Sequence, residues 1–267
     1  MEFSIIFKRL WDDYVASNPQ AAEIYNLLKK EESVIYNDHI ALRTFSDSRV
    51  DIRQIAQPFI DTGYKFSGTY NFEKKKLTAV HLEHSFDSDA PLVFISELRL
   101  DECSSYLKDN ITSCINMISS DVLACPLKLL FSHRPWGKPN YQVYQSLLKE
   151  SEYAAWTYVY GYRANHFTVF VNRLEKYNTI EKINSFLKRN NYKLNQSGGE
   201  IKGGVDDMLE QSSTIAEYNS VDFEEGVYDI PACFYEFARR YKDANGSIYK
   251  GFVEASANKI FESTNIR

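Results

Sequence analysis

The stretch NDHIALRTF, residues 37–45, places a histidine and an arginine four positions apart in a run that otherwise resembles a buried strand. Side chains alternate between the two faces of a strand, so His39 and Arg43 share one face. Ile40 and Leu42 take the other face, as a strand against an apolar core requires. A buried guanidinium needs an anionic partner because an unpaired buried charge is very costly. The pattern therefore indicates either a core histidine beside a structural ion pair, or a strand that lines a pocket.

Composition describes an ordinary globular chain. Its 267 residues are 44% hydrophobic, enough for one large domain or two fused small ones. Tyr and Phe number 19 and 17, which favours β-rich architecture. The net charge is -5, with both signs scattered and no basic stripe, so we expect no nucleic-acid partner.

The location that we expect is cytoplasmic. The first residues, MEFSIIFKRLWDDYV, lack the layout of a signal peptide, and no apolar run is long enough to span a membrane. None of the cysteines forms a CxxC pair, which disfavours a zinc ribbon. We expect them to be buried thiols.

Moving outward from residues 37–45, the same order of elements occurs twice. Apolar periodicity predicts a strand, then a helix, then at least two strands, at residues 34–45, 48–64, 75–85 and 90–100. The second half predicts the same order at residues 164–172, 179–192, 211–220 and 231–241. Two helices should precede the first set, separated at Asn18-Pro19, and residues 101–152 should be mostly helical.

Two further strand-like segments place a metal-binding side chain among apolar neighbours. His166 shares a face with Thr168, and Glu236 shares a face with Phe234. Together with His39, they would complete a set of two histidines and one carboxylate, which in Fe(II) oxygenases occupies one octahedral face. The pattern alone leaves alternatives open, because a strand histidine is often a core residue, and Glu236 could lie on a helix.

Other groups of potentially functional residues in the sequence give weaker evidence for a functional site. His81, Glu83 and His84 form HLEH, but its charged neighbourhood is typical of an exposed hairpin. His133 lies in a Pro/Gly-containing loop, which favours a structural role. A GxSxG motif is absent, and so is a Cys–His pairing at a helix start, which disfavours a covalent hydrolase.

Six blocks of the sequence, in this order, resemble the 2-oxoadipate dioxygenase/decarboxylase family, long known only as a domain of unknown function. They are NDHIALRTF, PLVFISELRL, EYAAWTYVYGYRANHFTVFVN, LEQSSTIAEYNSVDF, IPACFYEFARRY and YKGFVEASANKIFEST. The resemblance covers most of the chain, from about residue 34 to the end.

The resemblance implies an α+β fold similar to the vicinal oxygen chelate superfamily, in which paired βαβββ modules form a curled sheet around a metal, with added helices. We expect a single catalytic domain, 1–267, with N-terminal helices 1–33, a first module at about 34–100, a helical connection at about 101–152 and a second module at about 153–267.

The resemblance also implies an activity: conversion of a 2-oxo dicarboxylic acid, 2-oxoadipate, with dioxygen to 2-hydroxyglutarate and carbon dioxide, in lysine catabolism. The implied cofactor is Fe(II), although another divalent metal could occupy the site in a crystal. Its implied ligands are His39, His166 and Glu236. Arg43 would bind the distal carboxylate of the substrate, and Gln211 and Ser212 would line the pocket.

Two alternatives remain at this point. One is a different metal-dependent enzyme, an isomerase or lyase, on the same scaffold. The other is a module that binds a small molecule without turnover.

Overall fold

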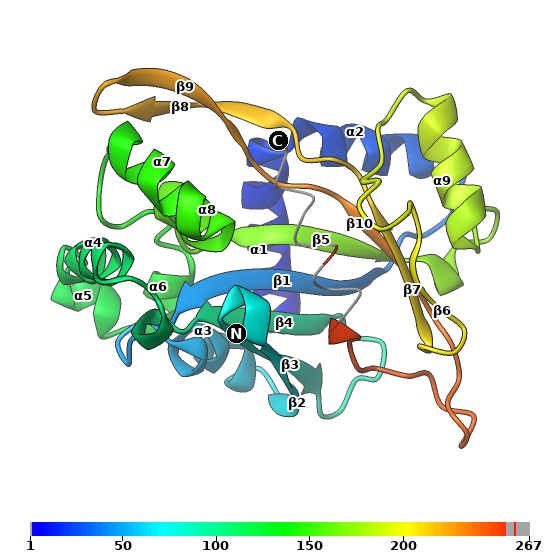
Figure 1. The fold of residues 1–267 in the computed structure, drawn as a ribbon. Coiled ribbons are helices and arrows are strands. Elements are labelled where there is room, and N and C mark those ends of the chain that lie inside the picture. Colours follow the sequence, from blue (N-terminus) through cyan, green and yellow to red (C-terminus); the bar gives the residue numbers. More distant parts are fainter. Residues whose placement is uncertain (1, 255–258, 260–267) are drawn as a thin grey trace.

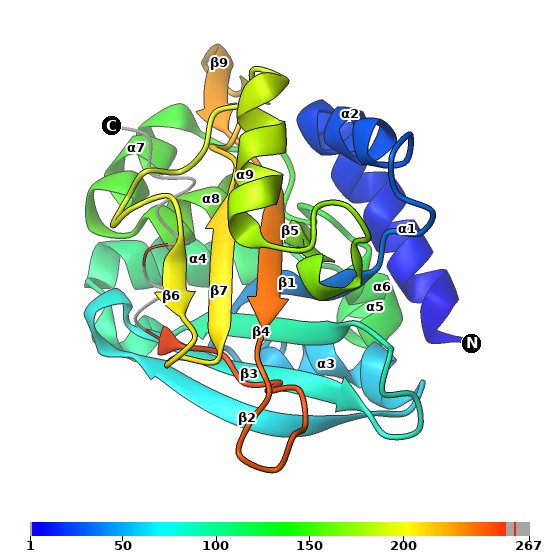
Figure 2. The same ribbon diagram turned by 90° about the vertical axis from the view of Figure 1, so that its right-hand side faces the viewer.

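The computed structural model describes residues 2–254 and 259, and one curled β-sheet organises it (Figure 1). The order of its eight strands is β2-β3-β4-β1-β5-β10-β7-β6, and β8 and β9 form a separate two-stranded sheet. The strands are β1 (Asn37–Phe45), β2 (Tyr64–Phe72), β3 (Leu77–His84), β4 (Leu92–Leu98), β5 (Ala164–Phe170), β6 (Lys202–Gly204), β7 (Leu209–Ser213), β8 (Tyr218–Phe223), β9 (Gly226–Pro231) and β10 (Glu236–Arg240). Figure 2 shows the curl, with β7 and β10 running nearly across β2 and β3.

Helices cover the outer face of this sheet and one end of its inner face (Figures 1 and 2). Among the described residues, the α-helices are α1 (Phe3–Ser17), α2 (Pro19–Leu28), α3 (Ile52–Ile60), α4 (Ser105–Asn116), α5 (Ser120–Leu123), α6 (Pro126–Leu130), α7 (Tyr141–Glu150), α8 (Glu152–Tyr160) and α9 (Ile180–Arg189). None of the helices in this part of the chain is long and apolar enough to cross a bilayer.

The sheet consists of two copies of one motif. In the first, β1 is followed by α3 and then by β2, β3 and β4, and β4 returns to pair parallel with β1. In the second, β5 is followed by α9, β6, β7 and β10, and β10 returns to pair parallel with β5. The prediction of an α+β fold with paired βαβββ modules is therefore confirmed. The single-domain boundaries stay a prediction.

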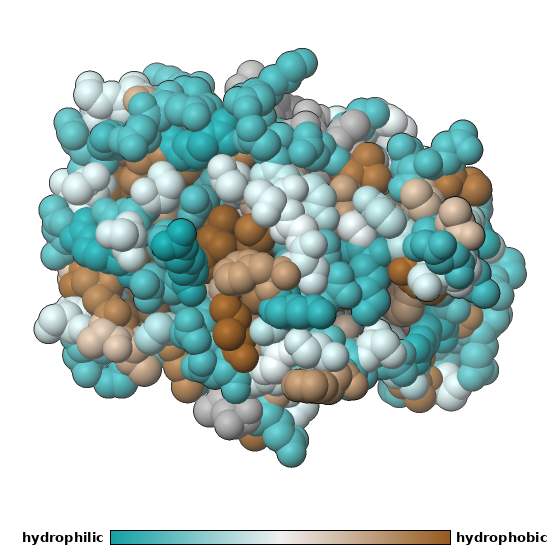
Figure 3. All heavy atoms as spheres, turned by 90° about the horizontal axis from the view of Figure 1, so that it is seen from below, coloured by the Kyte–Doolittle hydropathy of each residue, from teal (hydrophilic) through white to brown (hydrophobic). Residues whose placement is uncertain are grey.

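The sequence prediction did not include β2, β6 or β9, and one predicted strand is divided in two. β2 was not predicted, because it is an edge strand whose side chains are largely exposed and polar. The face that is seen from below in Figure 1 is accordingly mostly hydrophilic, with a compact group of hydrophobic residues near its centre (Figure 3). The expected strand at 211–220 is divided between β7 and β8, and β8 leaves the main sheet to pair with β9.

One local prediction is confirmed near the N-terminus. Asn18-Pro19 separates α1 from α2, and Pro19 is the first residue of α2, where its missing N–H costs nothing. Gly63 follows α3 with a φ of 104°, a left-handed conformation that glycine adopts without steric strain. The motif at 249–264 lies partly outside the described residues.

The two modules join where β1 and β5 pair antiparallel. The register shifts twice along this seam. One shift leaves Asp38 on β1 without a matched residue, and the other does the same for Asn165 on β5. Each is a β-bulge, which re-aims side chains locally.

The apolar face of the seam is covered by the N-terminal helix. The Trp11 and Tyr14 rings of α1 lie 5.1 and 5.0 Å from the Phe167 ring on β5. The Tyr14 hydroxyl donates a hydrogen bond of 2.6 Å to the Phe234 carbonyl, just before β10. This packing leaves the opposite face of β1 and β5, which carries His39 and His166, turned inward.

We expect the turn between α8 and β5 to tolerate only glycine at residue 161. Gly161 has a φ of 70°, and a Cβ there would lie 1.9 Å from the His133 carbonyl oxygen. Gly161→Ala should therefore lower the free energy of unfolding by about 3 kcal/mol or more, from backbone strain plus a clash. Gly137→Ala is the matched control, because Gly137 also has a positive φ but no atom within 4 Å of its Cβ position. It should cost about 1 to 2 kcal/mol. Equal losses in urea unfolding would contradict the clash.

Candidate metal centre

Three neighbouring strands bring the predicted ligands onto the inner face of the sheet. Thr168 on β5 is matched to His39 on β1 and to Glu236 on β10, so these three side chains form a row across the sheet. His166 lies two residues before Thr168 and therefore on the same face. The alternation that the sequence suggested thus continues across three strands.

The three side chains converge on one point. The Glu236 carboxylate lies 3.5 Å from Nε2 of His39 and 3.4 Å from Nε2 of His166. One possible ligand atom from each residue lies within 4.8 Å of the others, and all three residues are buried. The Phe234 ring stacks on His166 at 4.6 Å, and the Phe252 ring packs edge-on against His39 at 4.8 Å. These aromatic rings keep bulk water from two sides of the site.

Each histidine is oriented by the residue that precedes it. Nδ1 of His39 lies 2.7 Å from an Asp38 carboxylate oxygen, which can only accept, so Nδ1 donates and Nε2 is the nitrogen available to a metal. Nδ1 of His166 donates in the same way to the Asn165 side-chain oxygen at 3.1 Å. Asp38 and Asn165 are the two bulged residues of the seam. The bulges therefore fix the tautomer that directs both Nε2 atoms at Glu236.

Asp38 is itself held by Arg240 at the end of β10. The guanidinium donates from Nε and Nη2 to the two Asp38 oxygens at 2.7 and 2.9 Å. Its Nη1 donates to the carbonyls of Tyr249 and Gly251 at 3.0 and 2.8 Å. Arg240 thus connects Asp38, which orients His39, to the segment that carries Phe252.

Burial and the neighbouring side chains shift the pKa values of three residues at the site. Burial lowers the pKa of His166 well below its usual value, and the neighbouring His39 and Arg43 lower it further, so the ring is neutral. Burial alone would raise the pKa of Asp38, but Arg240 and the His39 hydrogen bond bring it to about 2. Burial raises the pKa of Glu236, because its charge is costly away from water. A cation beside Glu236 would offset that cost.

The donor set fits a divalent metal ion. Two neutral imidazoles and one carboxylate are the ligands of the facial triad found in Fe(II) oxygenases. Oε2 of Glu236 has no hydrogen-bond partner among the described residues although it is buried. The two histidine Nε2 atoms lie 3.5 and 3.4 Å from the Glu236 carboxylate oxygens. Adjacent ligand atoms of one metal ion are expected to lie about 3 Å apart, which is close to these distances. Within residues 2–254 and 259, this is the one His/Cys/Asp/Glu group that could hold a metal.

Gln211 and Ser212 are separated by strand alternation. The Gln211 amide donates to Oε1 of Glu236 at 2.7 Å and so orients the carboxylate. Ser212 is matched to Phe237, on the opposite face, and its hydroxyl donates to the Asn184 side chain of α9 at 2.7 Å. The structure thus brings Gln211 to the three candidate ligands, but not Ser212.

Arg43 lies further along β1, near the start of α8. Its side chain is 1% exposed, and Nη1 donates to Oε1 of Glu152 at 3.2 Å. The guanidinium lies 4.9 Å from each of the Tyr153 and Trp156 rings. The ion pair that the sequence left open as an alternative is therefore present.

The remaining histidines lie outside the centre, and one expectation about them was wrong. His81 is buried rather than exposed, with its Nδ1 2.8 Å from the Tyr70 hydroxyl and its ring against Phe252. Its sequence neighbours are charged, but the C-terminal segment covers this part of β3. His133 has the structural role expected from its loop, pairing with Asp13 at 2.9 Å. Of the cysteines, Cys114 and Cys233 are buried, whereas Cys103 and Cys125 are half-buried.

Asp38, Asn165 and Arg240 were missed by the sequence analysis. Strict alternation assigns Asp38 to the face opposite His39, and the bulge that changes this has no clear signature in the sequence. One signal was available: an oxygen-bearing residue directly precedes each histidine, in Asp38-His39 and Asn165-His166. This pairing indicates that Nδ1 of each ring has an acceptor.

The Asp38–Arg240 pair should make stability depend on acidity. The pKa of Asp38 is about 2 in the folded protein and 3.8 when unperturbed. A lowered carboxyl pKa stabilises the fold fully above the unfolded value, and this contribution is lost as the pH falls towards the folded value. We therefore expect the stability difference between the wild type and Asp38→Asn to narrow by about 2 kcal/mol between pH 5 and pH 2.

Urea unfolding at a series of pH values would measure this difference. Asp47→Asn is a comparison variant, because Arg49 also lowers the pKa of Asp47 but this pair is partly exposed, so the same narrowing should be smaller. A difference that stays constant over that range would contradict a strongly lowered Asp38 pKa.

Comparison with known proteins agrees with this geometry. The family model of 2-oxoadipate dioxygenase/decarboxylase matches residues 7–125 and 125–244. The rice protein "2-oxoadipate dioxygenase/decarboxylase, chloroplastic/amyloplastic" is 34% identical over 98% of this chain and 78% of its own length.

Solved structures show the same likeness. The rice hydroxyglutarate synthase in complex with 2-oxoadipate has a TM-score of 0.91 at 33% identity, covering 98% of this chain and 91% of its own. A Shewanella frigidimarina protein described as a candidate hydrolase has a TM-score of 0.89 at 46% identity, covering 94% and 98% of the two chains.

A more distant likeness concerns the fold alone. A glyoxalase-superfamily protein from Ralstonia eutropha has a TM-score of 0.74 at 17% identity, over 91% of this chain and 83% of its own. The vicinal oxygen chelate-like architecture that the sequence predicted is thereby confirmed. With the family model matching nearly the whole chain and the rice relative about one-third identical, the chain belongs to the 2-oxoadipate dioxygenase/decarboxylase family.

Proposed function

We propose that this protein is an Fe(II)-dependent dioxygenase/decarboxylase that converts 2-oxoadipate and dioxygen to 2-hydroxyglutarate and carbon dioxide. The reaction balances, because the two oxygen atoms that dioxygen supplies equal those needed for the new hydroxyl and for the oxidised keto carbon. A cytoplasmic location and a place in lysine catabolism stay predictions.

The observation that carries the proposal is the convergence of His39, His166 and Glu236 on one buried point in a chain of this family. When bound there, Fe(II) would supply open coordination positions for a 2-oxo acid and for dioxygen. His39, His166 and Glu236 would be its ligands, with Asp38, Asn165 and Gln211 orienting them through the hydrogen bonds described above.

Arg43 would bind the distal carboxylate of the substrate. It lies on the strand of His39, about 13 Å further along the backbone, and its charge contributes to the lowered pKa of His166. The Tyr153 and Trp156 rings restrict the guanidinium to one orientation. Arg43 can therefore fix the direction of the substrate chain while its 2-oxo acid end lies at the metal ligands.

Oxygen uptake by anaerobically iron-loaded protein tests the proposal. We expect consumption that depends on 2-oxoadipate, with equimolar release of carbon dioxide and formation of 2-hydroxyglutarate. The panel should include 2-oxoglutarate and the monocarboxylic 2-oxohexanoate. No uptake with any 2-oxo acid, from protein shown to hold iron, would overturn it and favour an isomerase, a lyase or a binding module.

Two substitutions should separate metal binding from substrate binding. His166→Ala removes one of three ligands and should lower iron occupancy at least about tenfold, with activity lost accordingly. Arg43→Ala should keep the iron but raise KM for 2-oxoadipate by about a hundredfold, because a buried charge-assisted contact is lost. Iron content and steady-state kinetics provide both measurements. Loss of iron in Arg43→Ala with retention in His166→Ala would reverse the assigned roles.

A further inference from the structure

Arg43 already has a carboxylate partner in this structure, and that partner belongs to the protein. Glu152 is the first residue of α8, and its Oε1 accepts from Arg43 Nη1 at 3.2 Å. If Arg43 receives the distal carboxylate of a dicarboxylic substrate, as proposed above, two carboxylates compete for one guanidinium. The inference below rests on that proposed function.

Glu152 is more accessible to solvent than Arg43. The Glu152 side chain is 16% exposed, whereas that of Arg43 is 1% exposed. The Arg43 guanidinium lies 4.9 Å from two aromatic rings, and one of them, Tyr153, is fixed by hydrogen bonds of 2.6 Å to the Ser96 carbonyl and 3.0 Å from the Thr44 amide. Exchange of partners would therefore move Glu152 and leave Arg43 in place.

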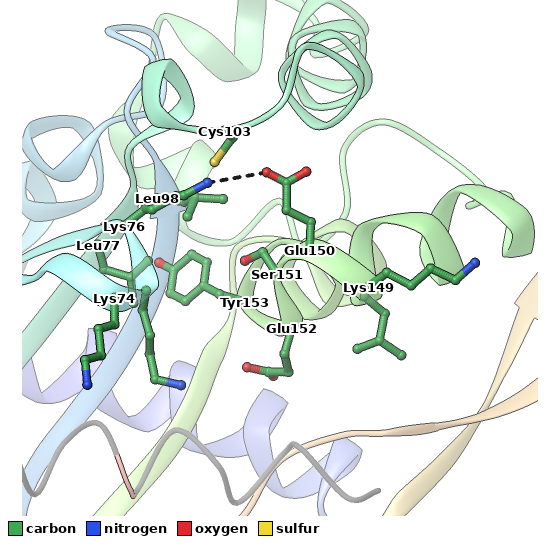
Figure 4. Close-up of a pocket in the computed structure, with 12 residues that line it drawn as sticks. Lys74, Lys76, Leu77, Leu98, Cys103, Lys149, Glu150, Ser151, Glu152 and Tyr153 are labelled. Carbon is green, nitrogen blue, oxygen red and sulfur yellow. Dashed lines mark ion pairs between the residues drawn. The ribbon is translucent and has the colours of Figure 1, made fainter.

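A place to which Glu152 could move lies next to it. Glu152 and Tyr153 line a cavity of about 230 Å³ that Lys74, Lys75, Lys76 and Lys149 also line, and of these the Lys149 side chain extends away from Glu152 (Figure 4). Figure 4 shows that Glu150 and Glu152 point away from each other. Glu150 turns to Lys76, with which it pairs at 3.6 Å, while Glu152 extends towards the side of the cavity that Lys74 also reaches. The positive charge of the lining lysines would offset the charge of a Glu152 carboxylate that has left Arg43.

We propose that Glu152 is a specificity-determining residue. Its carboxylate pairs with Arg43 in the free protein, and the distal carboxylate of the substrate replaces it there. Without substrate, Glu152 compensates the buried charge of Arg43. A dicarboxylic 2-oxo acid displaces it towards the lysine-lined cavity, and part of the binding free energy is used for this displacement. A monocarboxylic 2-oxo acid leaves the Arg43–Glu152 pair in place, so it does not leave the guanidinium without an anion.

Competition from Glu152 should reduce the preference of the wild type for dicarboxylic over monocarboxylic 2-oxo acids. Removing the charge of Glu152 removes the competitor of the distal carboxylate, so dicarboxylic acids should bind more tightly. The same change affects the free protein and its complex with a monocarboxylic ligand equally, because such a ligand does not displace Glu152, so the affinity for these ligands should change little. The ratio of the two affinities should therefore shift towards dicarboxylic acids.

Glu152→Gln tests this directly, because the amide keeps the size of the side chain and a hydrogen-bond acceptor. Anaerobic titration calorimetry of metal-loaded protein would give Kd for 2-oxoadipate and for 2-oxohexanoate, which has a methyl group in place of the distal carboxylate. We expect the ratio of the two Kd values to shift towards 2-oxoadipate by about tenfold. Glu150→Gln is the matched control, since Glu150 lines the same cavity but pairs with Lys76, and it should leave the ratio unchanged.

The outcomes separate this inference from the proposed function. If the wild type binds and oxidises 2-oxoadipate but Glu152→Gln leaves the ratio unchanged, or shifts it towards 2-oxohexanoate, the exchange is overturned and the function stands. If the wild type neither binds nor oxidises 2-oxoadipate, the proposed function itself fails. Should Glu152→Gln not fold by circular dichroism, Glu152→Asp takes its place. It keeps the charge but withdraws it by one methylene, so the ratio should shift in the same direction by less, and no shift would overturn the exchange.

Discussion

The antiparallel pairing of β1 with β5 is the constraint on which the site depends. It joins the two modules into one sheet and places His39 opposite Thr168 and Ala41 opposite His166. Because Thr168 is also matched to Glu236, the pairing decides which three side chains meet. A slip of one residue would turn every side chain of β1 to the other face. The two bulges add a second layer of control, since they bring Asp38 and Asn165 to the ring nitrogens that face away from Glu236.

Buried charged side chains in this protein occur in sets whose opposite charges offset each other. Asp38 is paired with Arg240, and Arg43 is paired with Glu152. Removal of one partner from a buried pair is strongly destabilising, so each of these four residues depends on its partner. Glu236 differs from them, because the described residues give it an amide and two imidazoles but no lysine or arginine side chain within ion-pair distance. A metal ion is the cation that would complete this third set.

Much of the site was predictable, because strand alternation is local and the blocks around His39, His166 and Glu236 resemble one family. The repeated element order was likewise visible in the apolar periodicity. Features that depend on tertiary contacts were not predictable. The bulge at Asp38 exists only in the register of β1 against β5, and Glu152 meets Arg43 across 109 residues of sequence. His81 is buried by Phe252, a distant residue, although its own neighbours are charged.

The long sequence separation between Arg240 and its partner Asp38 has a consequence for folding during synthesis. Asp38 and Arg240 are separated by 202 residues, and the same guanidinium binds the carbonyls of Tyr249 and Gly251. A ribosome releases the chain from its N-terminus, so His39 and Asp38 emerge long before any of these partners. No nascent fragment that ends before β10 contains Glu236, which means that a half-finished chain has no version of the site with three ligands. Assembly of the three candidate ligands is thereby deferred until the second module has been synthesised and has paired with the first.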